Sequence, residues 1–175
     1  MILRQARESD LPAIARLHAV SWRRAYAGML PARFLDHEMP RRMAADWVPA
    51  RLARQHVLVV EAGGLAGFAA ADIGAEALYV DNLHIAEDRK GQGIGRQLMV
   101  AMANEALARG CARLWLTVLK ENRPALAFYG RLGGAVSPPF DDDVMGCPVR
   151  SVAVAWTGPA LAELGMGVPQ RKDPR

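Results

Sequence analysis

The stretch DNLHIAEDRKGQGIGRQLM, residues 81–99, decides how the rest of the chain is interpreted. It continues an apolar run typical of a strand, passes through a charged loop and enters a helical pattern. Glycines at positions 91, 93 and 95 let backbone N–H groups approach a ligand, and a helix that begins there adds the positive end of its dipole. Arg89, Lys90 and Arg96 place cations at the same corner. One such contact contributes about 0.3–2 kcal/mol, so several N–H groups together are expected to bind a phosphate or pyrophosphate.

Two familiar phosphate loops do not fit the spacing. A Walker A loop needs Gly-Lys followed by Ser or Thr, whereas Gly95 is followed by Arg96 and Gln97. The dinucleotide-binding spacing needs a third glycine, where this chain has Arg96 or Leu98. The remaining pattern is Q/R-x-x-G-x-G/A, read here as KGQGIG over residues 90–95. Alone, this pattern is weak, because a plain glycine-rich turn from strand to helix has the same appearance.

The composition is that of one globular domain. The chain has 175 residues, 51% hydrophobic and 23% charged, and Lys plus Arg exceeds Asp plus Glu by 22 − 18 = 4. No basic run is long enough to predict a nucleic-acid partner, and no segment reaches the roughly 18 apolar residues of a membrane span, so no membrane partner is expected. Cys111 and Cys147 lack metal or redox spacing. We therefore expect no metal, reduced thiols and a cytoplasmic location.

Periodicity and turn residues predict alternating strands and helices. Strands are expected over 2–6, 56–61, 65–73, 75–85 and 112–118, from 135, and over 149–156. Helices are expected from residue 10, within 31–54, and over 96–109 and 122–132, with a loop at 138–145. A helix separates the strands 75–85 and 112–118, so these two should be parallel. The prediction is an α/β (α+β) fold: one domain over residues 1–157 with a mixed, mostly antiparallel sheet, a central parallel strand pair and flanking helices, followed by a flexible tail over 158–175.

Residues 118–134, VLKENRPALAFYGRLGG, carry a second motif. The pattern Asn-x-x-Ala-x-x-Phe-Tyr-x-x-x-Gly over residues 122–133 resembles the last conserved motif of the GNAT superfamily of N-acetyltransferases. The loop at residues 90–95, with Leu83-His84-Ile85 before it, resembles the acetyl-CoA pyrophosphate loop of the same family. The two motifs stand in the family's order, about one helix and one strand apart, and the resemblance covers roughly residues 2–156.

The resemblance implies a GNAT-like domain that uses acetyl-CoA as acetyl donor and needs no metal. The coenzyme-binding residues that it implies are Leu83, His84, Ile85, Arg89, Lys90, Gly91, Gln92, Gly93, Ile94, Gly95, Arg96, Asn122, Phe128 and Tyr129.

Each residue of the second motif also has a structural interpretation. Asn122 before Arg-Pro is a good helix N-cap without any ligand, and Phe128 is expected in the core. The resemblance makes Tyr129 the general acid, which would protonate the thiolate that acetyl transfer releases.

The acceptor amine must lose a proton, and the resemblance places a base near the two central strands. Asp81 is the first candidate and Glu76 the second. Alternation puts Asp81 on the face of Leu83 and Ile85, and a bulge of the kind found in the family's strand would be needed to re-aim it. A strand-edge carboxylate without a role remains the alternative. The resemblance also makes the Ile85 backbone N–H a donor to the acetyl carbonyl.

Three positions depart from the family pattern. Lys90 occupies the usual Gln or Arg position, and Glu87 stands where proline is usual; neither removes a backbone N–H group. Thr117 stands where members that acetylate ribosomal-protein N-termini often carry a glutamate base. This lowers the expectation of a protein N-terminus as acceptor.

The acceptor site is expected between residues 11 and 54, where Trp22, Tyr26 and Trp47 would form its wall by family analogy. The acidic residues there and at 141–143 form either a cationic-amine entrance or a solvated surface; they are Asp36, Glu38, Asp141, Asp142 and Asp143. His18 is expected to pack on a helix face. The arginines of this region are expected on a solvated face; they are Arg41, Arg42, Arg51 and Arg54.

Three functions follow. The first is an acetyl-CoA-dependent N-acetyltransferase that acts on the primary amine of a small molecule. The second is acetylation of a peptide N-terminus or lysine, and the third is a non-catalytic acyl-CoA-binding sensor. The apolar face of the last strand would pair across a homodimer or pack inside the fold, and the sequence leaves both open.

Overall fold

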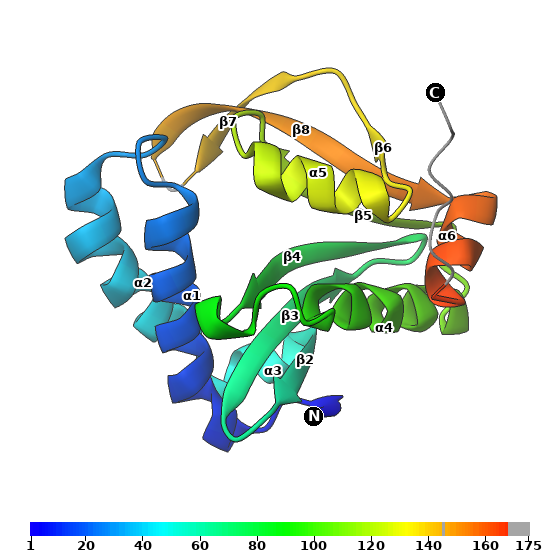
Figure 1. Cartoon of the computed structure of the whole chain (residues 1–175), viewed down its shortest axis with the longest axis horizontal. Coiled ribbons are helices and arrows are strands. Elements are labelled where there is room, and N and C mark those ends of the chain that lie inside the picture. The colour runs from blue at the N-terminus through cyan, green and yellow to red at the C-terminus, as the bar shows by residue number, and fades with distance from the viewer. Residues whose placement is uncertain (145, 168–175) are drawn as a thin grey trace. The chain divides into compact units, whose positions relative to one another are not determined.

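A computed structural model describes residues 1–144 and 146–167. Figure 1 shows the helices and strands along the chain. In chain order they are β1 (Ile2–Gln5), η1 (Glu8–Asp10), α1 (Leu11–Ala25), η2 (Phe34–Glu38), α2 (Met39–Asp46), α3 (Pro49–Arg54), β2 (Gln55–Glu61), β3 (Leu65–Ile73), β4 (Ala77–Ile85), η3 (Glu87–Arg89), α4 (Ile94–Ala108), β5 (Arg113–Leu119), α5 (Arg123–Arg131), β6 (Ala135–Val136), β7 (Phe140–Val144), β8 (Cys147–Thr157) and α6 (Gly158–Gly165).

The chain packs as two compact units. The first comprises Met1–Ile73 and Val80–Leu98, and the second comprises Gly74–Tyr79 and Met99–Arg175, so both contain part of β4 and part of α4. In the first unit the strand order is β1-β2-β3-β4, with β1–β2 and β2–β3 antiparallel. In the second, β4 and β5 are parallel, and β5, β6 and β7 each pair antiparallel with β8. The predicted fold class, with its parallel pair across a crossover helix, is confirmed.

One face of α1 forms the core of the first unit together with β2 and β3. Leu11, Ile14 and His18 recur every three to four residues and are buried, as the helical period requires. Phe68 on β3 lies against His18 with ring centroids 5.7 Å apart. The prediction that His18 packs on a helix face is confirmed.

The second unit has its own core around β8. Trp156 is fully buried, and its indole N–H donates to the carbonyl of Leu132 at 2.8 Å, just after α5. Tyr129 on α5 contacts the same indole edge-on, 5.9 Å between ring centroids. These contacts fix α5 against β8 (Figure 1).

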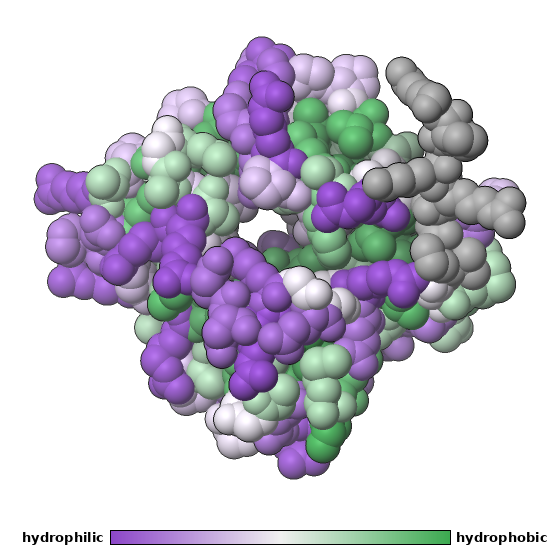
Figure 2. Space-filling model, viewed as in Figure 1, coloured by the Kyte–Doolittle hydropathy of each residue, from purple (hydrophilic) through white to green (hydrophobic). Residues whose placement is uncertain are grey.

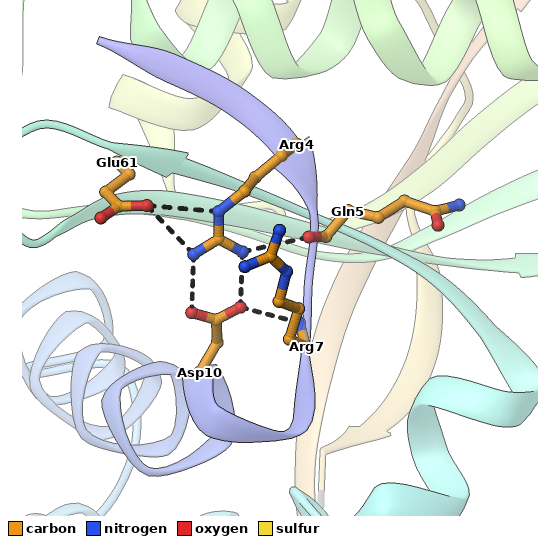
Figure 3. A network of polar contacts seen from close by, with 5 residues as sticks. All are labelled: Arg4, Gln5, Arg7, Asp10 and Glu61. Atoms are coloured by element: carbon orange, nitrogen blue, oxygen red, sulfur yellow. Dashed lines mark hydrogen bonds and ion pairs between the residues drawn. The ribbon is translucent and has the colours of Figure 1, made fainter.

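A polar network ties the start of α1 to the edge of the first unit's sheet (Figure 3). The Arg4 guanidinium donates to both carboxylate oxygens of Asp10, at 2.7 and 2.9 Å, and contacts Glu61 on β2 at 3.1 Å. Asp10 also accepts from the backbone N–H of Arg7 at 2.7 Å. This bidentate geometry is the stronger kind of charge-assisted pair, so the network fixes how the chain enters α1.

The predictions of an irregular loop at 138–145 and of a flexible tail at 158–175 are wrong in part. Residues 140–144, within the expected loop, form β7, because they pair with β8 from Phe140–Ser151 to Val144–Cys147; strand pairing overrides the poor strand propensity of three aspartates. The start of the expected tail forms α6, with Leu161 and Leu164 buried. The rest of that tail, residues 168–175, lies outside the described residues, and the domain boundary at residue 157 stays a prediction.

Candidate functional site

The predicted phosphate loop lies entirely in the first unit, between the end of β4 and the start of α4. Gly91 and Gly93 adopt φ values of 76° and 79°, which glycine tolerates far better than residues with a Cβ atom. The Gln97 N–H donates to the carbonyl of Gly93 and closes the first turn of α4. The N–H groups at the start of a helix have no helical partner, so this turn offers donors to an anion.

The charged residues around the loop contact one another. Lys90 pairs with Glu87 at 2.7 Å, and Arg24 on α1 reaches the same carboxylate at 3.1 Å; these two cations hold the pKa of Glu87 below its usual range. Arg89 donates to the carbonyl of Ala62 at 3.2 Å. Hydrophilic residues gather on the surface over α1, α2 and this loop (Figure 2).

A glycine that the sequence interpretation missed brings β4 close to α4. A Cβ atom on Gly67 of β3 would lie 2.8 Å from Ile85 Cδ1, 3.0 Å from Ile94 Cγ2 and 3.1 Å from the carbonyl oxygen of His84. Ile85 ends β4 and Ile94 begins α4. The absence of a side chain at Gly67 therefore lets both ends of the loop lie close to β3. The available signal was a glycine inside a strand pattern, which often marks a close approach.

His84 belongs to a cluster of rings between α1, β3 and β4. Its Nδ1 atom lies 2.9 Å from the Ser21 hydroxyl, and its ring centroid lies 4.5 Å from that of His18. Trp22, predicted in the acceptor wall, contacts His18 edge-on at 5.8 Å. Burial lowers the pKa of His84 to about 3 and that of His18 to about 2, so both rings are neutral at pH 7. The predicted wall residue Tyr26 contacts Trp22 edge-on at 4.7 Å.

Asp81, the first-choice base, is held by Arg51 of α3. The Arg51 Nη2 atom lies 2.5 Å from Asp81 Oδ2, and the Arg51 side chain is only 13% exposed. The expectation that Arg51 belongs to a solvated face is therefore wrong, although Arg41, Arg42 and Arg54 are exposed. Nothing in the sequence spacing links positions 51 and 81.

A polar cavity of about 320 Å³ lies beside this pair in the first unit. Its lining is charged or polar and comes from Asp46, Arg51, Arg54, Gln55 and Asp72.

The face of β4 that carries Asp81 is partly accessible to solvent. Leu78, Val80 and Asn82 are buried, Leu83 and Ile85 are half-buried, and the Asp81 side chain is 33% exposed. The Asp81 side chain therefore reaches solvent from the strand. Glu76, the second candidate, lies exposed in the bend before β4, in the second unit.

Phe128 and Tyr129 lie on α5 in the second unit, and Asn122 caps the start of that helix. The Asn122 side chain accepts from the Ala125 N–H at 3.3 Å, so its capping role is confirmed. Tyr129 is buried, whereas Phe128 is half-buried rather than in the core, and the two rings meet edge-on at 5.0 Å. On β5, the Thr117 hydroxyl lies 2.9 Å from that of Tyr79.

Three of the five acidic residues proposed for an entrance contact arginines at the surface, whereas Asp142 and Asp143 accept backbone N–H groups. Asp36 pairs with Arg23 at 3.0 Å, Glu38 lies 3.7 Å from Arg42, and Asp141 pairs with Arg150 at 3.3 Å. Within residues 1–144 and 146–167, no three His, Cys, Asp or Glu side chains gather as metal ligands. The same residues form no helix that is both long and apolar enough to span a membrane.

The chain is similar in sequence to known acetyltransferases. The sequence model of the acetyltransferase (GNAT) family matches residues 14–134. The uncharacterized N-acetyltransferase YuaI of Bacillus subtilis is 26% identical over 159 residues, 88% of this chain and 91% of that protein. Streptothricin acetyltransferase of Streptomyces lavendulae is 41% identical over 85 residues, 47% of this chain and 45% of that protein. The [ribosomal protein bS18]-alanine N-acetyltransferase of Escherichia coli K12 is 28% identical over 130 residues, 71% of this chain and 74% of that protein.

A solved structure shares the fold. PaiA N-acetyltransferase from Thermoplasma acidophilum, in complex with coenzyme A, superposes with a TM-score of 0.74 at 20% identity, covering 86% of this chain and 96% of that one. The family match spans both the phosphate loop and the α5 motif. The chain therefore belongs to the acetyltransferase (GNAT) family.

Proposed function

We propose that this acetyltransferase moves the acetyl group of acetyl-CoA to the primary amine of a small molecule. The observation that carries the proposal is the loop between β4 and α4, where Gly91 and Gly93 take positive φ and α4 opens with N–H groups that lack helical partners. A pyrophosphate is the ligand that such a turn suits. The coenzyme A bound to the similar PaiA protein supports this choice of ligand.

Tyr129 is the general acid in this proposal. Attack of the amine on the acetyl carbon breaks the C–S bond, and the thiolate takes the phenolic proton. A thiol pKa of about 8.5 against about 10 for a phenol makes this transfer uphill by only about 2 kcal/mol. The buried Tyr129, packed against Phe128 and Trp156, has a fixed ring that suits this role.

Asp81 is the general base. An alkyl ammonium of pKa about 10 loses its proton at pH 7 at a cost of about 4 kcal/mol, which a carboxylate lowers by accepting the proton directly or through water. Burial raises the pKa of Asp81, and Arg51 opposes this shift by lowering it. A raised carboxylate pKa favours proton acceptance near neutral pH.

A small-molecule acceptor is favoured over a peptide N-terminus by two observations. Thr117, in hydrogen-bond contact with Tyr79, stands where a glutamate base would be expected in enzymes that act on ribosomal-protein N-termini. The aromatic cluster of Trp22 and Tyr26 on α1 suits the carbon skeleton of a small amine. The 41% identity to streptothricin acetyltransferase over 85 residues points the same way.

The test is free-thiol release from acetyl-CoA with polyamines, aminoglycosides, amino acids and short peptides, for the natural protein, Tyr129→Phe and Tyr79→Phe. Each variant loses one phenolic hydroxyl from the second unit, so Tyr79→Phe is the matched control. We expect one class of amine to be acetylated, with turnover lost in Tyr129→Phe and retained in Tyr79→Phe. Unchanged turnover in Tyr129→Phe would remove that residue from the mechanism. Coenzyme binding without transfer to any amine would support a sensor instead.

A further inference from the structure

The two carboxylate oxygens of Asp81 differ in their surroundings. Oδ2 accepts from Arg51 Nη2 at 2.5 Å, from the Asn82 amide at 2.5 Å and from Gln55 Nε2 at 3.4 Å. Oδ1 accepts no hydrogen bond from any residue of the described ranges 1–144 and 146–167. The carboxylate is thus anchored through one oxygen and available through the other.

Arg51 is itself held on three sides. Its guanidinium carbon lies 4.1 Å from the centroid of the Trp47 ring, and its Nε donates to Gln55 Oε1 at 2.7 Å. Its third contact is Asp81, which lies on β4 in the first unit. An arginine stacked on an aromatic ring and bonded in its own plane has lost most of its rotamer freedom already. Its position is therefore preorganised with respect to Asp81.

The Trp47 ring is fixed in turn from α1. Trp47 is 4% exposed, and its indole N–H donates to His18 Nδ1 at 3.0 Å. His18 is buried and neutral, so its Nδ1 atom is a lone-pair acceptor for that N–H. A continuous series of contacts thus runs from α1 through His18, Trp47 and Arg51 to the carboxylate on β4.

We propose that Arg51 is a positioning residue for acetyl transfer: it holds Asp81 through Oδ2 and leaves Oδ1 to accept the proton of the acceptor ammonium. This inference rests on the proposed function. In the step, one N–H bond of the ammonium breaks and an O–H bond forms on Oδ1, directly or through one water. The neutral amine keeps the electron pair of the broken bond and uses it to attack the acetyl carbon.

The charged groups near Asp81 determine in which direction the pH dependence of activity shifts when Arg51 is removed. Asp72 on β3 raises the pKa of Asp81, as burial does, and Arg51 on α3 lowers it. Without Arg51, burial and Asp72 still favour the protonated carboxyl, which cannot accept a proton, and of these influences only the hydrogen bond from Gln55 still opposes them. Removal of Arg51 must therefore move the acidic limb of the activity profile to higher pH.

Arg54 provides the matched control. It lies one turn further along α3, lines the same cavity and is exposed, and it is not among the groups bonded to Asp81. Arg51→Met and Arg54→Met remove the same charge from the same helix. A difference between them reports the contact with Asp81 rather than net charge.

The experiment measures kcat and KM for acetyl-CoA and for the amine identified above, from pH 5 to 9. We expect the acidic limb of kcat in Arg51→Met to move up by about one pH unit or more, with kcat at pH 7 about tenfold lower. KM for acetyl-CoA should stay within about twofold. Arg54→Met should keep the natural profile. Arg51→Ala should recover kcat on addition of millimolar guanidinium, and Arg51→Lys should keep part of it, which separates a positioning role from loss of folding.

Three results would overturn the inference: an unshifted acidic limb in Arg51→Met, an equal shift in Arg54→Met, or a further loss when Arg51→Met is added to Asp81→Asn. If Asp81→Asn alone retains full kcat, the base and the inference fail together while the acetyltransferase remains. If the natural protein acetylates no amine, the proposed function fails first, and this is recognised before any variant is made.

Discussion

Replacing Gly67 by alanine should weaken coenzyme binding through a single added methyl group. That methyl carbon would lie 2.8 Å from Ile85 Cδ1 and 3.0 Å from Ile94 Cγ2, whereas carbon atoms in contact prefer about 3.5–4.0 Å. The His84 carbonyl oxygen, 3.1 Å away, belongs to the backbone of β4 and has less freedom to move than a side chain. Overpacking of this kind costs about 1–3 kcal/mol of folding free energy. The strain falls on the two residues that bracket the phosphate loop, so the loop N–H groups should be displaced from their binding geometry.

The assay is calorimetric titration with coenzyme A, together with urea unfolding of the same protein. The upper end of the overpacking cost is about 3 kcal/mol. If roughly half of it, about 1.4 kcal/mol, opposes the loop conformation that binds coenzyme A, the affinity for coenzyme A falls about tenfold. Gly165→Ala is the control, because its methyl would meet Asn104 Oδ1 at 2.8 Å and Leu107 Cδ1 at 2.9 Å, atoms at the ends of exposed side chains that can move aside. It should keep coenzyme affinity within about twofold. Unchanged affinity in a folded but destabilised Gly67→Ala protein would refute the role given to this close approach.

Two further predictions concern stability. Asp10→Asn should lower the free energy of unfolding at pH 7 by about 1–2 kcal/mol, because it removes the bidentate partner of Arg4. The hydrogen bond from Arg4 lowers the pKa of Asp10 in the folded state, so its contribution is complete above the unfolded pKa of about 3.9 and is lost as pH falls through the folded pKa. Urea unfolding from pH 7 to 3 should show a smaller acid loss in the variant; parallel curves would contradict the linkage. Asn122→Ala should cost about 1 kcal/mol by removing the cap of α5, whereas Asn122→Asp, which keeps an acceptor oxygen, should cost less, as thermal denaturation can check. Equal melting temperatures for the two would argue against the cap.

Most of the fold could be predicted because its elements carry local signals. The glycines before α4 and Asn122 before α5 mark boundaries that the structure places within two residues of the prediction. The start of α6 also had such a signal, since a proline in the first turn precedes Leu161 and Leu164 at helical spacing, but the glycine and charge content of residues 158–175 obscured it. The strand β7 had none, because its aspartates gain their conformation from pairing with β8.

The candidate site divides in the same way. The loop glycines and the α5 motif follow a fixed spacing, so they could be proposed from the sequence alone. The anchoring of Asp81 did not follow from any spacing, since Arg51 lies 30 positions away along the chain. The low exposure of the Arg51 side chain depends on Trp47, whose own ring is held by a hydrogen bond to His18. Contacts of this kind exist only once α1, α3 and β4 have packed together.

The most direct test of the central claim is the time course of free-thiol release from acetyl-CoA in the presence of each amine class, with mass spectrometry of the acceptor. The account predicts stoichiometric thiol release and one added acetyl group on a small primary amine, with transfer lost in Tyr129→Phe and retained in Tyr79→Phe. Thiol release that requires no amine, or coenzyme A that does not bind at all, would contradict it.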